Sequence, residues 1–264
     1  MILNIPRGIL FPLITVTTVS LADFAMVWVH LPTAYYPSPA ALFYALQNGP
    51  VRLYFPFLVA LVAAIRLSGD LENRFIANTR SRIGIQTYLR TEIRRVATST
   101  FGIFGSISLV KATLAFTLIP AVMPKLIQPG AYAGSLDAIQ ALDEAQSPLA
   151  ATLHLGWPAF ALSAGIWTGA NASALAALSV VAMILLKNRV LALLLPAGIY
   201  VLESFVTQLL ELPGQSFLIS ALYPGGLQNY PLWQALVPLL SLGLTCAITL
   251  WYLVRHSPHN QRFA

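Results

Sequence analysis

Six long apolar runs constrain this chain more than any other feature of its sequence. A helix needs about 20 mainly apolar residues to cross the ~30 Å hydrocarbon core of a bilayer. With 57% hydrophobic residues and a mean hydropathy of +0.73, this 264-residue chain cannot hide its apolar surface as a soluble protein. The runs predicted to span a membrane are residues 8–29, 54–67, 96–122, 156–186, 190–210 and 232–254. The second run is short, and its helix can begin upstream, near Val51.

The pattern within these runs predicts helices. None of them alternates polar and apolar residues as barrel strands do, and a helix satisfies its own backbone hydrogen bonds in lipid. We therefore predict an all-α membrane protein with six transmembrane helices, in a single domain over residues 1–264. The first run is too long for the apolar core of a signal peptide, so we expect this helix to be retained.

The distribution of Lys and Arg predicts the orientation, because these residues accumulate in loops that stay in the cytoplasm. With the N-terminus inside, 12 of the 15 Lys and Arg fall in inner segments; Arg52 and Lys125 fall outside, and Lys111 lies within a helix. Both termini are therefore predicted to be cytoplasmic. A basic inner face against anionic lipid accounts for the pI of about 9.7, and we expect no nucleic-acid binding.

Motifs of catalysis and cofactor binding are absent from the sequence. None of the three lysines follows a glycine as a nucleotide-binding P-loop requires, and neither HExxH nor GxSxG occurs. His256 and His259 lack a third ligand nearby, and the single cysteine, Cys246, gives neither a disulfide framework nor a thiolate cluster. We expect no metal, no cofactor and no enzymatic activity in this chain.

Residues 66–95 form a charged stretch that holds seven of the 15 Lys and Arg. The spacing of its apolar residues predicts two short amphipathic helices, with a break between Asn78 and Gly84. Arginines alone would suit lipid phosphates, but Asp70 and Glu72 would be repelled by anionic lipid. The stretch therefore predicts contact with a protein partner, with a purely lipid-facing surface as the alternative.

Motifs in and around this stretch resemble those of ABC-2 type permeases, the six-helix membrane subunits of small bacterial ABC exporters. The charged stretch has Asp70, four residues, Phe75, six residues, Arg82, five residues and then Tyr88-Leu89. The likeness runs from about Tyr35 to Tyr223 and includes Tyr35-Tyr36-Pro37-Ser38, Pro120, Lys187-Asn188-Arg189 and Leu193-Leu194-Leu195-Pro196. One position departs from the family, which commonly carries Gly where Arg74 stands here.

This resemblance implies a partner that hydrolyses ATP. In such permeases the loop after the second helix forms a coupling helix, which lies in a groove of a separate ATP-binding cassette subunit. Closure of two such subunits moves a permease pair between inward-open and outward-open states. Here residues 70–82 would make the contact, and residues 86–95 would form an amphipathic elbow leading into the third helix. The expected contact residues are Asp70, Glu72, Asn73, Arg74, Phe75, Arg80, Arg82, Lys187 and Arg189.

The function that the resemblance implies is that of a permease subunit in the bacterial cytoplasmic membrane. It would work as a dimer and move a substrate, with export as the family's usual direction. The alternatives are an ATP-independent multi-pass transporter, a substrate-binding membrane subunit of an importer, and an integral membrane enzyme. A solo transporter often carries inverted repeats or paired broken helices, and the two halves of this sequence show no internal similarity.

Three ionisable residues, Asp23, Lys111 and Glu203, fall inside predicted spans. At 1.5 Å per residue, each lies about 20 Å from the inner edge of its helix. A lone charge at a helix centre costs roughly 2.5 to 3.5 kcal/mol on insertion scales. We therefore expect Lys111 to pair with Asp23 or Glu203, either to lock helices together or to form an outer-cavity site that touches the cargo.

A ridge of small residues marks the fourth predicted span. Gly165, Gly169, Ser173 and Ala177 recur every four residues, and such ridges let helix backbones approach closely in lipid. The ridge predicts packing within one chain, with a pairing face between two copies as the alternative.

The topology can be tested with single cysteines in a Cys246→Ser background. Cysteines at Arg80 and Lys187 should resist a membrane-impermeant thiol reagent in intact cells, whereas cysteines at Ala131 and Gln215 should react, because the Lys and Arg bias places the first pair inside. Strong labelling at position 80 would contradict this orientation.

Overall fold

The computed structural model of the chain describes residues 35–49, 51–72, 85–129, 135–186, 188–226 and 230–256, and four single positions, Ile14, Thr17, Ala25 and Val29. Those four positions are helical, and the rest of the first predicted span lies outside the described residues. The described residues form helices and no strand, with one isolated bridge between Tyr36 and Ile127. The predicted all-α class is thus confirmed for this part of the chain.

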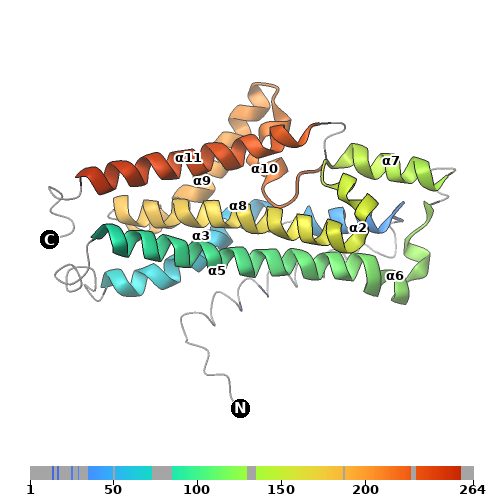
Figure 1. Ribbon diagram of the computed structural model, residues 1–264, viewed down its shortest axis with the longest axis horizontal. Helices are drawn as coiled ribbons and strands as arrows, with labels where there is room; N and C mark the ends of the chain where they lie inside the picture. The colour runs from blue at the N-terminus through green and yellow to red at the C-terminus, as the bar shows by residue number, and fades with distance from the viewer. Residues whose placement is uncertain are drawn as a thin grey trace, which may run out of the picture.

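Seven longer helices make up the bundle (Figure 1), with short helical turns between them. The longer helices are α2 (Pro39–Gln47), α3 (Val51–Glu72), α5 (Ile85–Thr113), α7 (Leu136–Gln146), α8 (Trp157–Leu185), α9 (Arg189–Leu209) and α11 (Leu232–His256). The short turns are η2 (Leu114–Leu118), α6 (Ile119–Val122), η3 (Pro124–Leu126), η5 (Ala150–Leu155), η6 (Pro213–Gln215) and α10 (Phe217–Ser220).

Within the described residues, four helical segments are long and apolar enough to cross a membrane: Arg90–Val122, Trp157–Leu185, Val190–Leu209 and Leu232–Tyr252. Their limits agree closely with the last four predicted spans, so a multi-pass membrane protein fits the structure. The apolar part of α3, Val51–Ala64, is shorter. This helix does begin at Val51, as the sequence allowed, and it runs on to Glu72.

The first two turns of α5 correct one prediction. Residues 86–95 were expected to form a separate amphipathic elbow, but α5 runs without a break from Ile85 to Thr113. No Gly or Pro lies between Ile85 and Val96, so nothing interrupts the backbone hydrogen bonds. Near its other end the helix widens into the π-helical turn η2 just before Pro120, which lacks the N–H that a regular helix would use.

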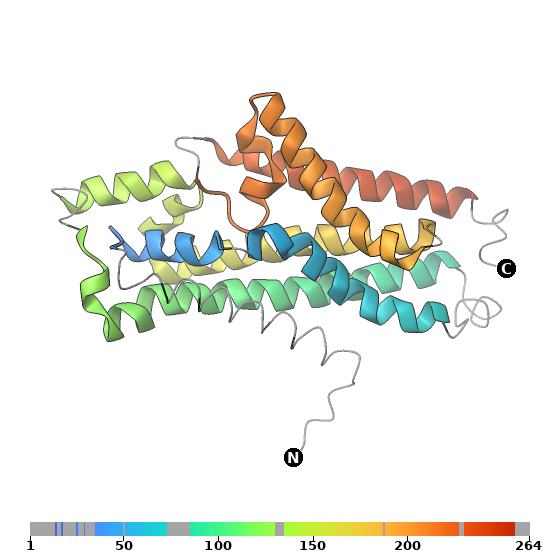
Figure 2. The ribbon, with the colours of Figure 1, turned by 180° about the vertical axis from the view of Figure 1, so that it is seen from behind.

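The second predicted span is preceded by α2, a short helix that the hydropathy pattern did not predict. The Ser38 hydroxyl caps α2 by accepting a hydrogen bond from the Ala41 N–H at 3.0 Å, and Pro39 occupies the first helical position. Asn48-Gly49-Pro50 separates α2 from α3 in the sequence, and the residue before a proline disfavours helical backbone. The two helices follow one another along the long axis of the molecule (Figure 2).

The buried helix α8 packs against α3, α5, α9 and α11, and its small-residue ridge faces α5. A Cβ added to Gly105 would lie 3.1 Å from the Gly165 carbonyl oxygen, and one added to Gly169 would lie 2.9 Å from the Phe101 ring. One turn further along, the Ser173 hydroxyl donates to the Ala97 carbonyl at 2.8 Å. Packing within one chain is thereby confirmed, and this ridge is not available to pair two copies.

The chain between α9 and α11 folds back into the bundle beside α8 (Figure 1). The Trp167 indole N–H donates to the Ser220 carbonyl at 2.6 Å, and the Thr168 hydroxyl donates to the Leu222 carbonyl at 2.7 Å. Leu222 and Tyr223 are buried there. The segment that the hydropathy pattern leaves as an outer loop therefore contributes part of the core.

Gly169→Leu should lower the folded yield and the Tm of the purified protein, because the new side chain has no room against Phe101. Overpacking of this kind typically costs about 1–3 kcal/mol. The matched control is Gly102→Leu on α5, where a Cβ would meet no atom within 4 Å. Equal Tm values for the two variants, measured by fluorescence-detected unfolding in detergent, would contradict the close contact.

Candidate functional site

The predicted contact with an ATPase subunit maps to one end of the molecule. Asp70 and Glu72 are in the last turn of α3, and Arg189 is the first residue of α9. The end of α3, the start of α5, the α8–α9 junction and the end of α11 all lie at this end, opposite α6 and α7 (Figure 1). The other predicted contact residues lie outside the described residues: Asn73, Arg74, Phe75, Arg80, Arg82 and Lys187.

The first turns of α5 give this end a basic surface. Arg90, Arg94 and Arg95 are exposed, whereas Glu92 is buried. At the α8–α9 junction the Asn188 side chain caps α9, its Oδ1 accepting from the Val190 N–H at 3.0 Å and the Leu191 N–H at 3.3 Å. This cap gives Arg189 a defined place at the start of a helix.

Lys111 is buried in α5, with 6% of its surface exposed. Its Nζ donates to the Leu46 carbonyl at 2.6 Å. Leu46 lies in the last turn of α2, where carbonyl groups lack helical partners and the helix dipole favours a cation. Lys111 thus stabilises the end of a short helix within the bundle.

Glu203 on α9 binds the backbone at the start of α10. Its Oε2 accepts from the Phe217 N–H at 2.9 Å, and the neighbouring Ser204 hydroxyl accepts from the Leu218 N–H at 3.1 Å. Among the described residues no ion pair joins Glu203 to Lys111, so this alternative of the predicted pairing is wrong. The prediction assumed that equal residue counts along two helices place their side chains at the same depth. This holds only for parallel helices, and α9 runs obliquely to α5 and α8 (Figure 2). Asp23 lies outside the described residues.

Arg52 is the residue of this site that the sequence analysis missed. The charge count assigned it to an outer segment, but it lies at the start of α3 and reaches into the bundle. Its Nε donates to the Leu218 carbonyl, its Nη1 donates to Asn48 Oδ1 at 2.9 Å, and its own carbonyl accepts from the Tyr200 hydroxyl at 3.0 Å. The signal in the sequence was an Arg two residues after Asn48-Gly49-Pro50, within an otherwise apolar region.

These contacts surround the break between α2 and α3. Leu46 binds Lys111, Asn48 binds Arg52, and the amide of Gln47 between them donates to the Ser108 hydroxyl at 2.7 Å. We call this group the break cluster: Gln47, Asn48, Arg52, Ser108, Lys111, Tyr200, Glu203 and Ser204. Interrupted helices with polar residues at membrane depth are typical of sites that bind a polar group or an ion. Its chemistry suits binding rather than a reaction.

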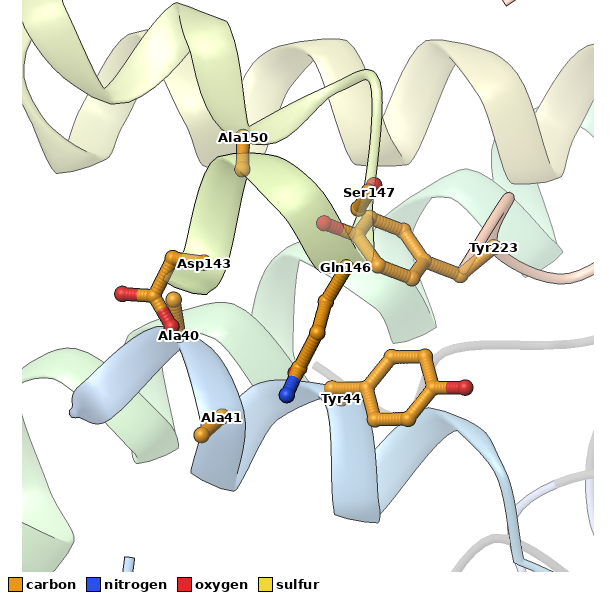
Figure 3. A pocket seen from close by; sticks show the side chains of 8 residues that line it. All are labelled: Ala40, Ala41, Tyr44, Asp143, Gln146, Ser147, Ala150 and Tyr223. Carbon is orange, nitrogen blue, oxygen red and sulfur yellow. The ribbon is translucent and has the colours of Figure 1, made fainter. Parts of the chain in front are cut away.

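A second polar group lines a shallow recess between α2, α7 and Tyr223 (Figure 3). Asp143 Oδ1 accepts from the Ser38 hydroxyl at 2.8 Å. Burial raises the pKa of Asp143, the Ser38 hydroxyl acts to lower it, and the charge of Glu144 acts to raise it. The Ser147 hydroxyl donates to the Pro224 carbonyl at 2.7 Å. The Asp143–Ser38 bond holds α7 on α2, and the Ser147–Pro224 bond holds the end of α7 on the segment after α10. These polar groups therefore bind within the protein rather than present free groups to a ligand.

Within the part of the chain that the structure describes, no group of three or more His, Cys, Asp or Glu side chains is arranged to hold a metal ion. Comparison with protein families, with curated proteins and with solved structures finds no match. The likeness to ABC-2 type permeases therefore rests on the motifs of the sequence alone.

Lys111→Met should reduce the folded yield, because it removes the donor that satisfies the Leu46 carbonyl inside the bundle. If Asp23 also faces Lys111, the added change Asp23→Asn should restore part of the yield. Glu203→Gln in its place should restore none, because Glu203 binds Phe217. The measurement is the monodisperse fraction in size-exclusion chromatography, and a wild-type yield for Lys111→Met would show that the contact is dispensable.

Proposed function

We propose that this chain is the membrane-spanning subunit of an ABC transporter, with ATP hydrolysed by a separate ATP-binding cassette subunit. The observation that carries the proposal is that the described parts of the predicted contact, the end of α3 and the start of α9, lie at one end of the bundle (Figure 1). The three exposed arginines of α5 lie at the same end. The family likeness adds a second copy of the permease, a location in the bacterial cytoplasmic membrane and export as the direction.

Two continuous helices offer a route for mechanical coupling. From Ile85 to Lys111, α5 covers about 39 Å, and from Glu72 back to Arg52, α3 covers about 30 Å, at 1.5 Å per residue. Both helices therefore link the proposed ATPase contact to the break cluster. A displacement at the charged end would reach Lys111 and Arg52 through rigid elements, which is what an ATP-driven change of access requires.

A transporter that works without ATP, or the substrate-binding membrane subunit of an importer, is the second candidate. The interruption between α2 and α3 favours it, because discontinuous helices commonly build the substrate sites of secondary transporters. Uptake or release by the purified protein in proteoliposomes without ATP would support this candidate over the first.

Asp70→Arg with Glu72→Arg should reduce co-purification of an ATPase from the native host's membranes at least ten-fold, because both acids lie at the predicted contact. The readouts are the ATPase activity and the P-loop protein recovered with the tagged chain. The control with the same charge change is Asp137→Arg with Glu211→Arg, two exposed acids outside the contact end. Equal recovery with both double variants would leave the charged stretch as a lipid-facing surface.

A further inference from the structure

Buried polar atoms without a hydrogen-bond partner concentrate in one region of the described bundle. Five such side-chain atoms occur among the described residues, and four of them lie around Arg52: Asn48 Nδ2, Arg52 Nη2, Ser216 Oγ and Tyr230 Oη. The fifth, Glu92 Oε1, belongs to α5 near the charged end. Buried polar groups in folded proteins are nearly always paired, so four orphans in one place call for a missing partner.

Arg52 is bonded to Asn48, and Ser216 and Tyr230 belong to segments that approach Arg52. Arg52 binds Asn48 through Nη1 and the Leu218 carbonyl through Nε, and Ser216 lies only two residues before Leu218. Tyr230 lies close enough to Arg52 to feel its charge. The turn that contains Ser216 also approaches Tyr230, since a Cβ on Gly214 would lie 3.5 Å from the Tyr230 ring. Ser216 is fully buried and Tyr230 is 9% exposed, so water from the bulk does not reach their hydroxyls freely.

The unpaired atoms have one chemistry in common. Arg52 Nη2 can only donate hydrogen bonds, and the hydroxyls of Ser216 and Tyr230 can donate as well. Asn48 Nδ2 is also a donor, and the Tyr44 hydroxyl lies within its reach. No carboxylate of the described residues forms an ion pair with Arg52, and the nearby Glu203 is occupied by the Phe217 N–H. A group of donors around a partly buried cation suits an acceptor that carries negative charge.

The surroundings indicate what carries that acceptor. Leu202 and Phe205, on either side of Glu203 and Ser204 on α9, are exposed, as is Trp233 at the start of α11. In a membrane these side chains, on the helix that carries Glu203 and on the helix that follows Tyr230, face hydrocarbon. A molecule with an anionic head and an apolar tail would satisfy both surfaces at once.

We propose that Asn48, Arg52, Ser216 and Tyr230 form a binding site for the phosphate or carboxylate group of an anionic, lipid-like molecule. Arg52 supplies the positive charge and the N–H groups of Nη2. Asn48 orients the guanidinium by accepting from Nη1, and the two hydroxyls complete the set of donors. The site does not depend on an ATPase partner, so its test is separate from that of the proposed function.

The test is the thermal unfolding of the full chain in neutral detergent, titrated with dioleoylphosphatidylglycerol or, as the uncharged-lipid comparison, dioleoylphosphatidylcholine. The phosphatidylglycerol should raise the Tm by several degrees, and Arg52→Gln should weaken its apparent affinity at least ten-fold. Lys125→Gln, which removes an exposed cation outside the charged stretch, should leave the affinity unchanged. Equal shifts by the two lipids, or equal weakening in both variants, would overturn the proposal.

A second variant keeps the test decisive if Arg52→Gln does not fold. Ser216→Ala with Tyr230→Phe removes two unpaired hydroxyls, so without lipid its Tm should equal or exceed that of the wild type. Its affinity for phosphatidylglycerol should nevertheless fall several-fold. Wild-type affinity in this double variant would mean that water or strain, and not a ligand, accounts for the orphaned hydroxyls, and the proposal would fail.

Inorganic phosphate, titrated in the same assay, distinguishes the two sources of the anion. A shift with phosphatidylglycerol but not with phosphate assigns the site to a lipid-like molecule. A shift with phosphate alone would overturn the lipid-like assignment. No shift with either probe would overturn the site altogether.

Discussion

Inside a bilayer every backbone N–H and C=O needs a partner from the protein itself, and this constraint accounts for the charged residues within the bundle. Two of the places where the described chain leaves regular helix lie between α2 and α3 and around α10. Lys111 satisfies the Leu46 carbonyl, Arg52 the Leu218 carbonyl and Glu203 the Phe217 N–H. Each of these three charges thus supports irregular backbone.

The glycine contact between α5 and α8 complements this arrangement. Because Gly105 and Gly165 let the two backbones meet, α5 is held along α8 and presents Ser108 and Lys111 to the end of α2. The segment around α10 is held from the other side, by Trp167 and Thr168 of α8. One central helix therefore positions both irregular segments, and the break cluster lies between them.

Long apolar helices could be predicted from the sequence, because the summed hydropathy of about 20 residues decides whether a segment enters the bilayer, whatever its individual residues prefer. The helices α8, α9 and α11 begin and end within two residues of their predicted limits. Short helices could not, since α2 and α7 depend on single caps, Ser38 and Ser135, rather than on a long pattern. The candidate site was found only in part. Lys111 and Glu203 were visible as charges in apolar runs, but the backbone groups that they bind could not be predicted, because neither the tilt of a helix nor a returning loop can be read from residue counts.

The way in which Arg52 is used separates a structural role from a binding role. Holding the Leu218 carbonyl takes one N–H and holding Asn48 takes another, and a neutral Gln can make at least one such bond without burying a charge. The guanidinium keeps an unused Nη2 beside two buried, unpaired hydroxyls. A purely structural role does not require these extra donors. In hydrocarbon, unpaired donors destabilise the fold unless a hydrogen-bond acceptor binds them. A bound anion neutralises the charge of Arg52 and accepts hydrogen bonds from the unpaired donors. Ligand binding therefore explains this arginine better than a structural role does.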